Sequence, residues 1–360
     1  MKQIKVENQK QIYDWLKTDR LDVLADLFET ADRVRKDNVG DDIHLRGLVE
    51  ISNKCSRLCA YCGLNAANAD INRYALTRDE IISSVKLAVE LGYGTVVLQA
   101  GEDKNISPEF IADVVREIKS GTELAVTLSL GEWPDEVYRL WKTAGADRYL
   151  LKFETSDRRL YRRVHPGSDE HRLEILPRLQ RLGFETGSGV MVGLAGQSFE
   201  TLAEDIFLFA EMQLDMIGIG PFIYDPDSVL GREPENYLLD ENNQVPNTEI
   251  MALKALALTR IMCPTANLPV TTSLSTLNTQ SGLEKALKCG GNVIMPNVTP
   301  MQYRTDYRIY PGKASLVEPK VYLMKLTERL SAIGRTVSTG QGCSLKYLTR
   351  TERQVQNVSE

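Results

Sequence analysis

The sequence lacks the features of a secreted or membrane-bound protein. Its 360 residues include only three histidines, three tryptophans and six cysteines. The N-terminus, MKQIKVENQKQIYDW, has no apolar segment of the kind that forms a secretory signal. No run of about 18 apolar residues is present to form a membrane-spanning helix. We therefore expect a cytoplasmic protein with reduced thiols and no membrane association.

Basic residues are not in excess. The chain has 43 Lys and Arg against 49 Asp and Glu, for a formal net charge of -6. Such a balance disfavours binding to duplex nucleic acid, so we expect no nucleic-acid partner. The 42% hydrophobic and 26% charged content is that of a globular protein. The length allows one large α/β barrel or two to three ordinary domains.

Short apolar runs alternate with helical stretches along most of the chain. Several runs are β-branched and apolar on both faces, as strands buried in a parallel sheet should be. Helical patterns between them carry start signals, with Thr77 and Glu80 as a capping box and Ser107 before Pro108. The eight candidate strands are 44–51, 95–99, 124–130, 148–153, 186–193, 216–220, 269–273 and 292–295.

Eight such strand and helix pairs within roughly 250 residues have the size of a TIM-type (βα)8 barrel. An open doubly wound sheet fits the pattern about equally well. Apolar positions at helical spacing near the N-terminus indicate a helical extension ahead of the barrel. We expect an N-terminal helical cap at 1–43, a barrel at 44–313 and a C-terminal helical extension and tail at 314–360. The polar segment 225–247 is expected to be an extended loop after the sixth strand.

Three cysteines, Cys55, Cys59 and Cys62, crowd into the segment after the first strand. In a barrel this segment is a βα loop at the catalytic rim. A tetrahedral zinc site would need a fourth protein ligand, and the only nearby histidine, His44, lies inside a strand. A [4Fe–4S] cluster held by three cysteines instead leaves one iron open for an exogenous ligand. Of the other cysteines, Cys263 and Cys289 are expected as buried free thiols, and Cys343 stands alone in a Gly-rich tail.

Polar residues mark two further strands. Thr127 and Ser129 share one face of the third strand, where a pair of hydroxyls would suit a polar ligand. Arg148, Lys152 and Glu154 share one face of the fourth. Ionised groups on a buried strand need partners, so we expect them to pair with one another, with Arg172 or with a charged ligand.

The cysteine segment, with Tyr61 before the third cysteine and Gly63 after it, resembles the signature of the radical S-adenosylmethionine (SAM) superfamily. In that superfamily the amino and carboxylate groups of SAM chelate the open iron, and an electron from the cluster releases a 5′-deoxyadenosyl radical. The resemblance implies one [4Fe–4S] cluster held by Cys55, Cys59 and Cys62. It also implies SAM as cofactor, an external one-electron donor and work in the absence of oxygen.

Seven further stretches are similar to the HydE family of [FeFe]-hydrogenase maturases, whose relatives are biotin synthase and methylornithine synthase. They are VVLQAGED, VTLSLGEWP, AGADRYLLKFET, GFETGSGVMVGLAGQ, DMIGIGPF, LPVTTS and GNVIMPNVTP, and the similarity spans about residues 44–313. The resemblance implies a complete barrel that encloses the cluster and an anionic, amino-acid-chelated small substrate, with other maturation proteins as partners.

Residue by residue, the resemblance assigns SAM-binding and substrate-binding groups but no catalytic side chain. The SAM site it implies consists of Tyr61, Gln99, Ala100, Gly101, Glu102, Glu154, Arg172 and the turn from Gly193 and Leu194 to Gly196. The substrate site it implies consists of Arg46, Thr127, Arg148, Thr271, Thr272 and Tyr303. Tyr307 and Tyr310 match the same tyrosine-rich segment, but their helical spacing fits the core at least as well.

Two features depart from the family pattern. Many members carry three further cysteines near the C-terminus for a second cluster, and 315–324 has none, so we predict a single cluster. Phe153 stands where the family usually has His, which predicts a different substrate or radical environment. Three alternatives therefore stay open: a HydE-like enzyme with another substrate, an isomerase of the methylornithine-synthase kind, and a non-catalytic zinc or iron–sulfur protein.

Overall fold

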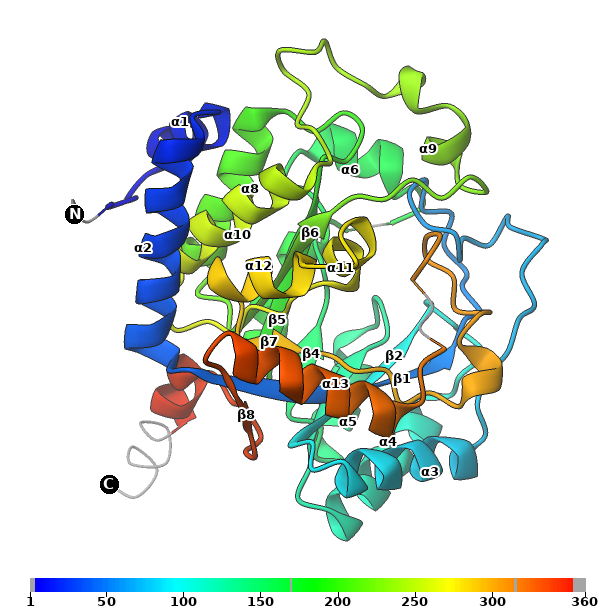
Figure 1. Cartoon of the computed structure of the whole chain (residues 1–360). Coiled ribbons are helices and arrows are strands. Elements are labelled where there is room, and N and C mark those ends of the chain that lie inside the picture. Colours follow the sequence, from blue (N-terminus) through cyan, green and yellow to red (C-terminus); the bar gives the residue numbers. More distant parts are fainter. Residues whose placement is uncertain (1–3, 169, 314–315, 352–360) are drawn as a thin grey trace, which may run out of the picture.

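A computed structural model describes residues 4–168, 170–313 and 316–351. Parallel strands curl around the centre of the molecule and helices cover the outside (Figure 1). The strands follow one another in the order β6-β5-β4-β3-β2-β1-β7, without the reversal of a doubly wound sheet. Their bounds are β1 (Asp42–Ser52), β2 (Thr95–Ala100), β3 (Ala125–Ser129), β4 (Arg148–Leu150), β5 (Glu185–Val192), β6 (Met216–Pro221) and β7 (Val293–Ile294).

An eighth segment closes the ring between β6 and β7. Parallel bridges join Met216 to Asn267, Ile219 to Val270, and Pro269 to Val293. Residues 267–270 therefore occupy the place of the missing strand, and the predicted (βα)8 barrel is confirmed. A further short strand, β8 (Thr336–Ser338), pairs with the start of β1 outside this ring.

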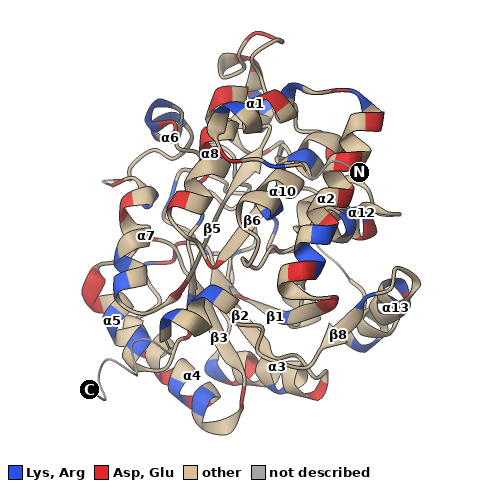
Figure 2. Cartoon of the chain, turned by 90° about the vertical axis from the view of Figure 1, so that its left-hand side faces the viewer, with Lys and Arg blue, Asp and Glu red and all other residues tan. Residues whose placement is uncertain are grey.

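The helices form the outer layer, and residues of both charge signs lie on their surface (Figure 2). The expected caps are present: Thr77 and Glu80 form a capping box, and the Ser107 side chain accepts from the Phe110 N–H. The helices are α1 (Gln9–Lys17), α2 (Leu21–Val39), α3 (Arg78–Glu90), α4 (Pro108–Gly121), α5 (Asp135–Thr143), α6 (Arg158–Val164), α7 (Arg172–Arg181), α8 (Phe199–Glu211), α9 (Val229–Arg232), α10 (Glu249–Met262), α11 (Thr272–Leu277), α12 (Gly282–Lys288) and α13 (Pro319–Ala332), with 3-10 turns at Pro234–Asn236 and Met301–Tyr303.

The N-terminal helices pack on the outside of the barrel. In α1, Ile12 and Leu16 are buried, and in α2, Leu24 and Leu27 are buried. These faces lie against α8 and α10 (Figure 1). Within the described residues, no helix is both long enough and apolar enough to cross a membrane.

Three sequence-based boundaries were wrong. The strand predicted at 269–273 ends early, because Thr272 begins α11 and the backbone leaves the extended conformation there. The fourth strand stops at Leu150 instead of 153, since the backbone leaves the extended conformation and reaches a left-handed φ of 67° at Glu154. The loop at 225–247 is not simply extended, because it contains α9 and a 3-10 turn.

Candidate active site

A cavity of about 360 Å³ opens at the carboxyl ends of the barrel strands, within the size range of small-molecule sites. Its walls come from strands β1 to β6 and from the loops that follow them. All three clustered cysteines line it, together with six other predicted SAM-site residues: Tyr61, Gln99, Ala100, Gly101, Glu102 and Glu154. Arg172 at the start of α7 also lines it, and so do Thr271 and Thr272.

The cysteine loop is fixed by main-chain hydrogen bonds to its neighbours. The Ser56 N–H donates to the Glu102 carbonyl over 2.9 Å, and the Ala60 N–H donates to the Val164 carbonyl over 2.8 Å. The Gly63 N–H donates to the Ile309 carbonyl over 3.1 Å. Backbone groups paired in this way hold the loop in one conformation, so the three thiols are presented to the cavity in a fixed arrangement.

Gly101 is required for this arrangement. A Cβ atom on Gly101 would lie 2.3 Å from the Lys54 carbonyl oxygen and 3.0 Å from Cys55 Cβ. The end of β2 therefore packs directly onto the cysteine loop, and only glycine permits that approach.

The three thiols are placed as the ligands of a multinuclear cluster would be. They face one cavity, as a cluster with several irons requires. Burial raises the pKa of Cys59 to about 12 and that of Cys62 above its usual range, so binding a metal must displace their protons.

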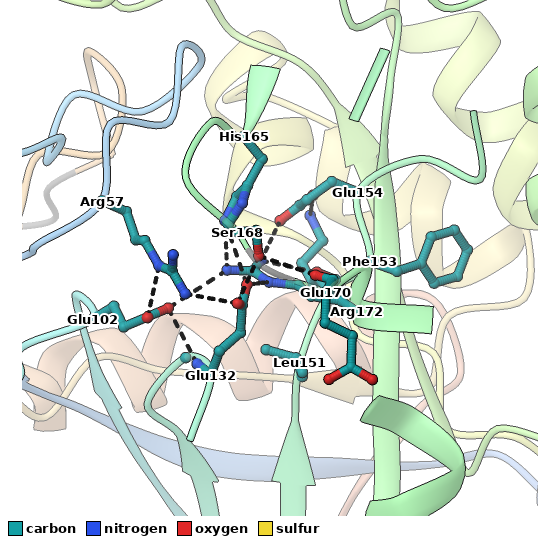
Figure 3. Close-up of polar contacts among 12 residues, drawn as sticks. Arg57, Glu102, Glu132, Leu151, Phe153, Glu154, His165, Ser168, Glu170 and Arg172 are labelled. Carbon is teal, nitrogen blue, oxygen red and sulfur yellow. Dashed lines mark hydrogen bonds and ion pairs between the residues drawn. The ribbon is translucent and has the colours of Figure 1, made fainter. Parts of the chain in front are cut away.

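A network of buried charges forms the wall beside the cysteine loop (Figure 3). Arg57 donates to Glu102 over 2.7 Å and to Glu132 over 2.7 Å. Arg172 donates from Nε to Glu132 over 2.7 Å and from Nη1 to the Lys152 carbonyl over 3.0 Å. Burial lowers the pKa of His165 to about 3, so its neutral ring accepts from Arg172 Nη2 over 2.9 Å.

Glu154 has an unused acceptor in this wall. Its Oε2 is buried and accepts no hydrogen bond within the described part of the chain, although Lys152 Nζ lies 3.3 Å away. Its φ of 67° is rare for a residue other than glycine and costs about 1–3 kcal/mol. A strained residue whose buried carboxylate has an ion-pair neighbour but accepts no hydrogen bond can make a further contact with a ligand in the cavity.

Other parts of the cavity lining carry hydroxyl groups and one ion pair. The Thr272 and Tyr310 hydroxyls lie 2.5 Å apart, and the Tyr307 hydroxyl accepts from Gln99 over 3.1 Å. Lys313 pairs with Glu50, and its ammonium lies 4.6 Å from the centre of the Tyr307 ring. Both Tyr307 and Tyr310 line the cavity.

Three predicted substrate residues, Arg46, Thr127 and Arg148, lie deeper in the barrel and do not line this cavity. Arg148 pairs with Glu185 over 2.5 Å and donates to the Gln341 carbonyl, while Arg46 donates to the Gly342 carbonyl over 3.0 Å. The C-terminal tail therefore supplies hydrogen-bond partners for Arg148 and Arg46. The sequence had predicted a ligand or other charged strand residues as their partners.

Other predicted residues also lie outside the cavity. Tyr303 stacks on Tyr74 and donates to Glu80 over 2.8 Å. Gly193 and Leu194 do not line it either; a Cβ on Gly193 would lie 2.3 Å from Asn247 Cα, so this glycine serves chain packing. Phe153 is fully buried and points away from the charged network drawn in Figure 3. The replacement of the family's usual His by Phe at this position therefore changes the core and not the charged wall.

Sequence reasoning missed Arg57, Glu132, Glu50 and Lys313. Arg57 could have been found from its place between two of the cysteines, and Glu132 from its place after the third strand. Glu50 and Lys313 are far apart in sequence and gave no signal, because only the fold brings them together.

Comparison with known proteins agrees with this site. Residues 49–209 match the Radical SAM superfamily. The [FeFe] hydrogenase maturase subunit HydE of Thermotoga maritima is 46% identical over 293 residues, which cover 81% of this chain and 80% of that protein. The 3-methylornithine synthase of Methanosarcina acetivorans is 25% identical over 290 residues, or 79% of this chain and 78% of that one.

The fold also has solved counterparts. The structure of methylornithine synthase (PylB) matches 93% of this chain and 95% of its own, with a TM-score of 0.76 at 21% identity, a likeness of fold alone. The extent of the match to the maturase goes well beyond fold. This chain belongs to the HydE family of radical SAM enzymes, which use a [4Fe–4S] cluster and S-adenosylmethionine.

Proposed function

We propose that this enzyme is an [FeFe]-hydrogenase maturase that cleaves SAM inside its barrel and acts there on a small substrate. The observation that carries the proposal is one cavity lined by the three clustered thiols, by Glu154 and Arg172, and by Thr271 and Thr272. Its likeness to the Thermotoga maritima maturase supports the choice of reaction.

Each group of residues has a separate task in this proposal. Cys55, Cys59 and Cys62 hold the cluster, which supplies an electron and an iron with an open position when bound. Glu154 and Arg172 provide opposite charges for the polar end of SAM, and Tyr61 and the stretch from Gln99 to Glu102 form the wall beside it. Thr271 and Thr272 donate hydrogen bonds to the substrate.

The chain must also keep water and stray side chains away from the reacting atoms. Phe222, Met191 and Tyr61 belong to one apolar cluster, and all three line the cavity. An apolar wall of this kind excludes water, which protects a reactive intermediate from side reactions.

The partners and location belong to the same proposal. We assign an external one-electron donor, other maturation proteins and the cytoplasm. All six cysteines are free thiols, which fits a reducing compartment. The same proposal divides the chain into a helical cap at 1–43, a barrel at 44–313 and a C-terminal extension at 314–360.

The test uses anaerobically reconstituted protein. On reduction it should convert SAM to 5′-deoxyadenosine, and it should restore hydrogenase activity to a maturation mixture that lacks only its HydE. Rearrangement of lysine, without any effect on hydrogenase, would instead show an isomerase of the methylornithine-synthase kind. Failure of a fully loaded protein to cleave SAM would reject both functions.

A further inference from the structure

Glu132 is the most heavily bonded carboxylate near the cavity. It follows β3, its side chain is 10% exposed, and its two oxygens accept from three side chains. Arg172 Nε reaches Oε1 over 2.7 Å, while Arg57 Nη2 and Ser168 Oγ each reach Oε2 over 2.7 Å (Figure 3). The preceding Gly131 has φ of 81°, which turns the Glu132 N–H onto Glu102.

The two arginines on Glu132 come from different parts of the site. Arg57 lies between Cys55 and Cys59 in the cysteine loop, whereas Arg172 begins α7 and lines the cavity. Among the described carboxylates, only Glu132 makes hydrogen bonds to both guanidinium groups. A charge-assisted contact on each oxygen therefore fixes the cofactor wall relative to the cysteine loop.

Arg172 has a second carboxylate within reach. Its Nη1 lies 3.9 Å from Glu154 Oε1, too far for a hydrogen bond, and Glu154 Oε2 is the buried oxygen without a hydrogen bond. Glu102 Oε2 is also 3.9 Å from Arg172, but it already accepts from the Glu132 N–H over 3.1 Å, while Arg57 and Lys104 pair with Oε1. If Glu132 lost its charge, Glu154 Oε1 would be the strongest remaining acceptor for Arg172, since Lys152 lies on the side of the other oxygen.

We propose that Glu132 is a positioning residue that holds Arg172 away from Glu154 Oε1, and so leaves the Glu154 carboxylate, with Lys152 beside its other oxygen, available to the cationic part of SAM. The inference rests on the proposed SAM site and assigns no chemical step to Glu132. A buried ion-pair network that only stabilises the fold would show the same contacts but would not link Glu132 to Glu154 in ligand binding.

A double-mutant cycle separates the two roles. Glu132→Gln, Glu154→Gln and the double variant are compared with wild type as oxidised, cluster-loaded protein without reductant, so SAM binds but is not cleaved. We expect Glu132→Gln to retain its iron and bind SAM about tenfold more weakly. In the Glu154→Gln background the same change should add less than about threefold, because Arg172 no longer has a charged competitor.

Glu170→Gln is the matched control. Glu170 lies in the same loop as Ser168, but its carboxylate pairs with Arg178 over 2.6 Å, outside the network. Its SAM affinity, iron content and unfolding temperature should equal those of wild type.

Each outcome decides the inference. Wild-type SAM affinity in iron-loaded Glu132→Gln, or equal losses in both backgrounds, overturns the positioning role and leaves the proposed function standing. A loaded wild-type protein that does not bind SAM overturns both. If Glu132→Gln fails to load its cluster, Glu132→Asp decides: its shorter carboxylate cannot reach both arginines, so SAM should bind more weakly, and unchanged affinity overturns the role.

Discussion

Replacing Gly101 by alanine should disrupt the cysteine loop even before any ligand binds. The added methyl would lie 2.3 Å from the Lys54 carbonyl oxygen, and this neighbour is backbone that cannot rotate away. Either β2 or the loop must shift, and overpacking of this kind costs about 1–3 kcal/mol. Because Cys55 is the next residue after Lys54, the shift would also move the first of the three thiols.

Two measurements check this prediction. Denaturant unfolding of the metal-free protein should show the loss of about 1–3 kcal/mol, and anaerobic reconstitution should give well below the iron content of wild type. Gly121→Ala is the control, since a Cβ there meets nothing within 4 Å and should stabilise the C-terminal end of α4 by about 0.5–1 kcal/mol. Unchanged stability and full iron in Gly101→Ala would refute the packing argument.

Two further predictions concern buried charges remote from the cavity. Glu185→Gln leaves Arg148 buried without a carboxylate and should lower the free energy of unfolding in denaturant by about 3–5 kcal/mol. Asp113→Asn breaks only the exposed pair with Arg116 and should lower it by less than about 1 kcal/mol. Equal losses in the two variants would contradict this prediction. Burial raises the pKa of Asp205 to about 7, so the folded chain keeps a proton there that the unfolded chain releases above about pH 4. The unfolding free energy of wild type should therefore fall relative to Asp205→Asn from about pH 4 to about pH 7 and then level off, and a constant difference across that range would be the contrary result.

The barrel and its metal-binding loop could be predicted because their signals are local. The β-branched runs, the caps at Thr77 and Ser107 and the spacing of Cys55, Cys59 and Cys62 are readable within short windows. Each of these features depends on neighbours a few residues apart, so the sequence alone was enough to place them.

The inner surface of the barrel could not be predicted in the same way. Arg46 and Arg148 were assigned to a substrate, but the carbonyl groups of Gly342 and Gln341 reach them from the far end of the chain. Strand periodicity tells which residues face the interior, but not how deep they lie or which remote segment meets them. For the same reason the pairing of Glu50 with Lys313 became visible only in the fold.

The resemblance to the family predicted the cofactors, but it did not reveal every task of the residues it assigned. Gly101 and Glu102 line the cavity as the SAM assignment requires, and in addition the Glu102 carboxylate pairs with Arg57 and the glycine makes room for Lys54. A motif can therefore serve the cofactor through the loop it supports, which the sequence pattern does not distinguish from direct contact.

The central claim is that three thiolates hold a [4Fe–4S] cluster whose remaining iron binds SAM. Mössbauer spectra of the anaerobically reconstituted protein, recorded with and without SAM, test it most directly. We predict that about one iron in four changes its signal when SAM is added, as expected for a cluster with one open position. Spectra in which all irons are alike and unaffected by SAM, or a protein that takes up zinc in place of iron, would contradict the account.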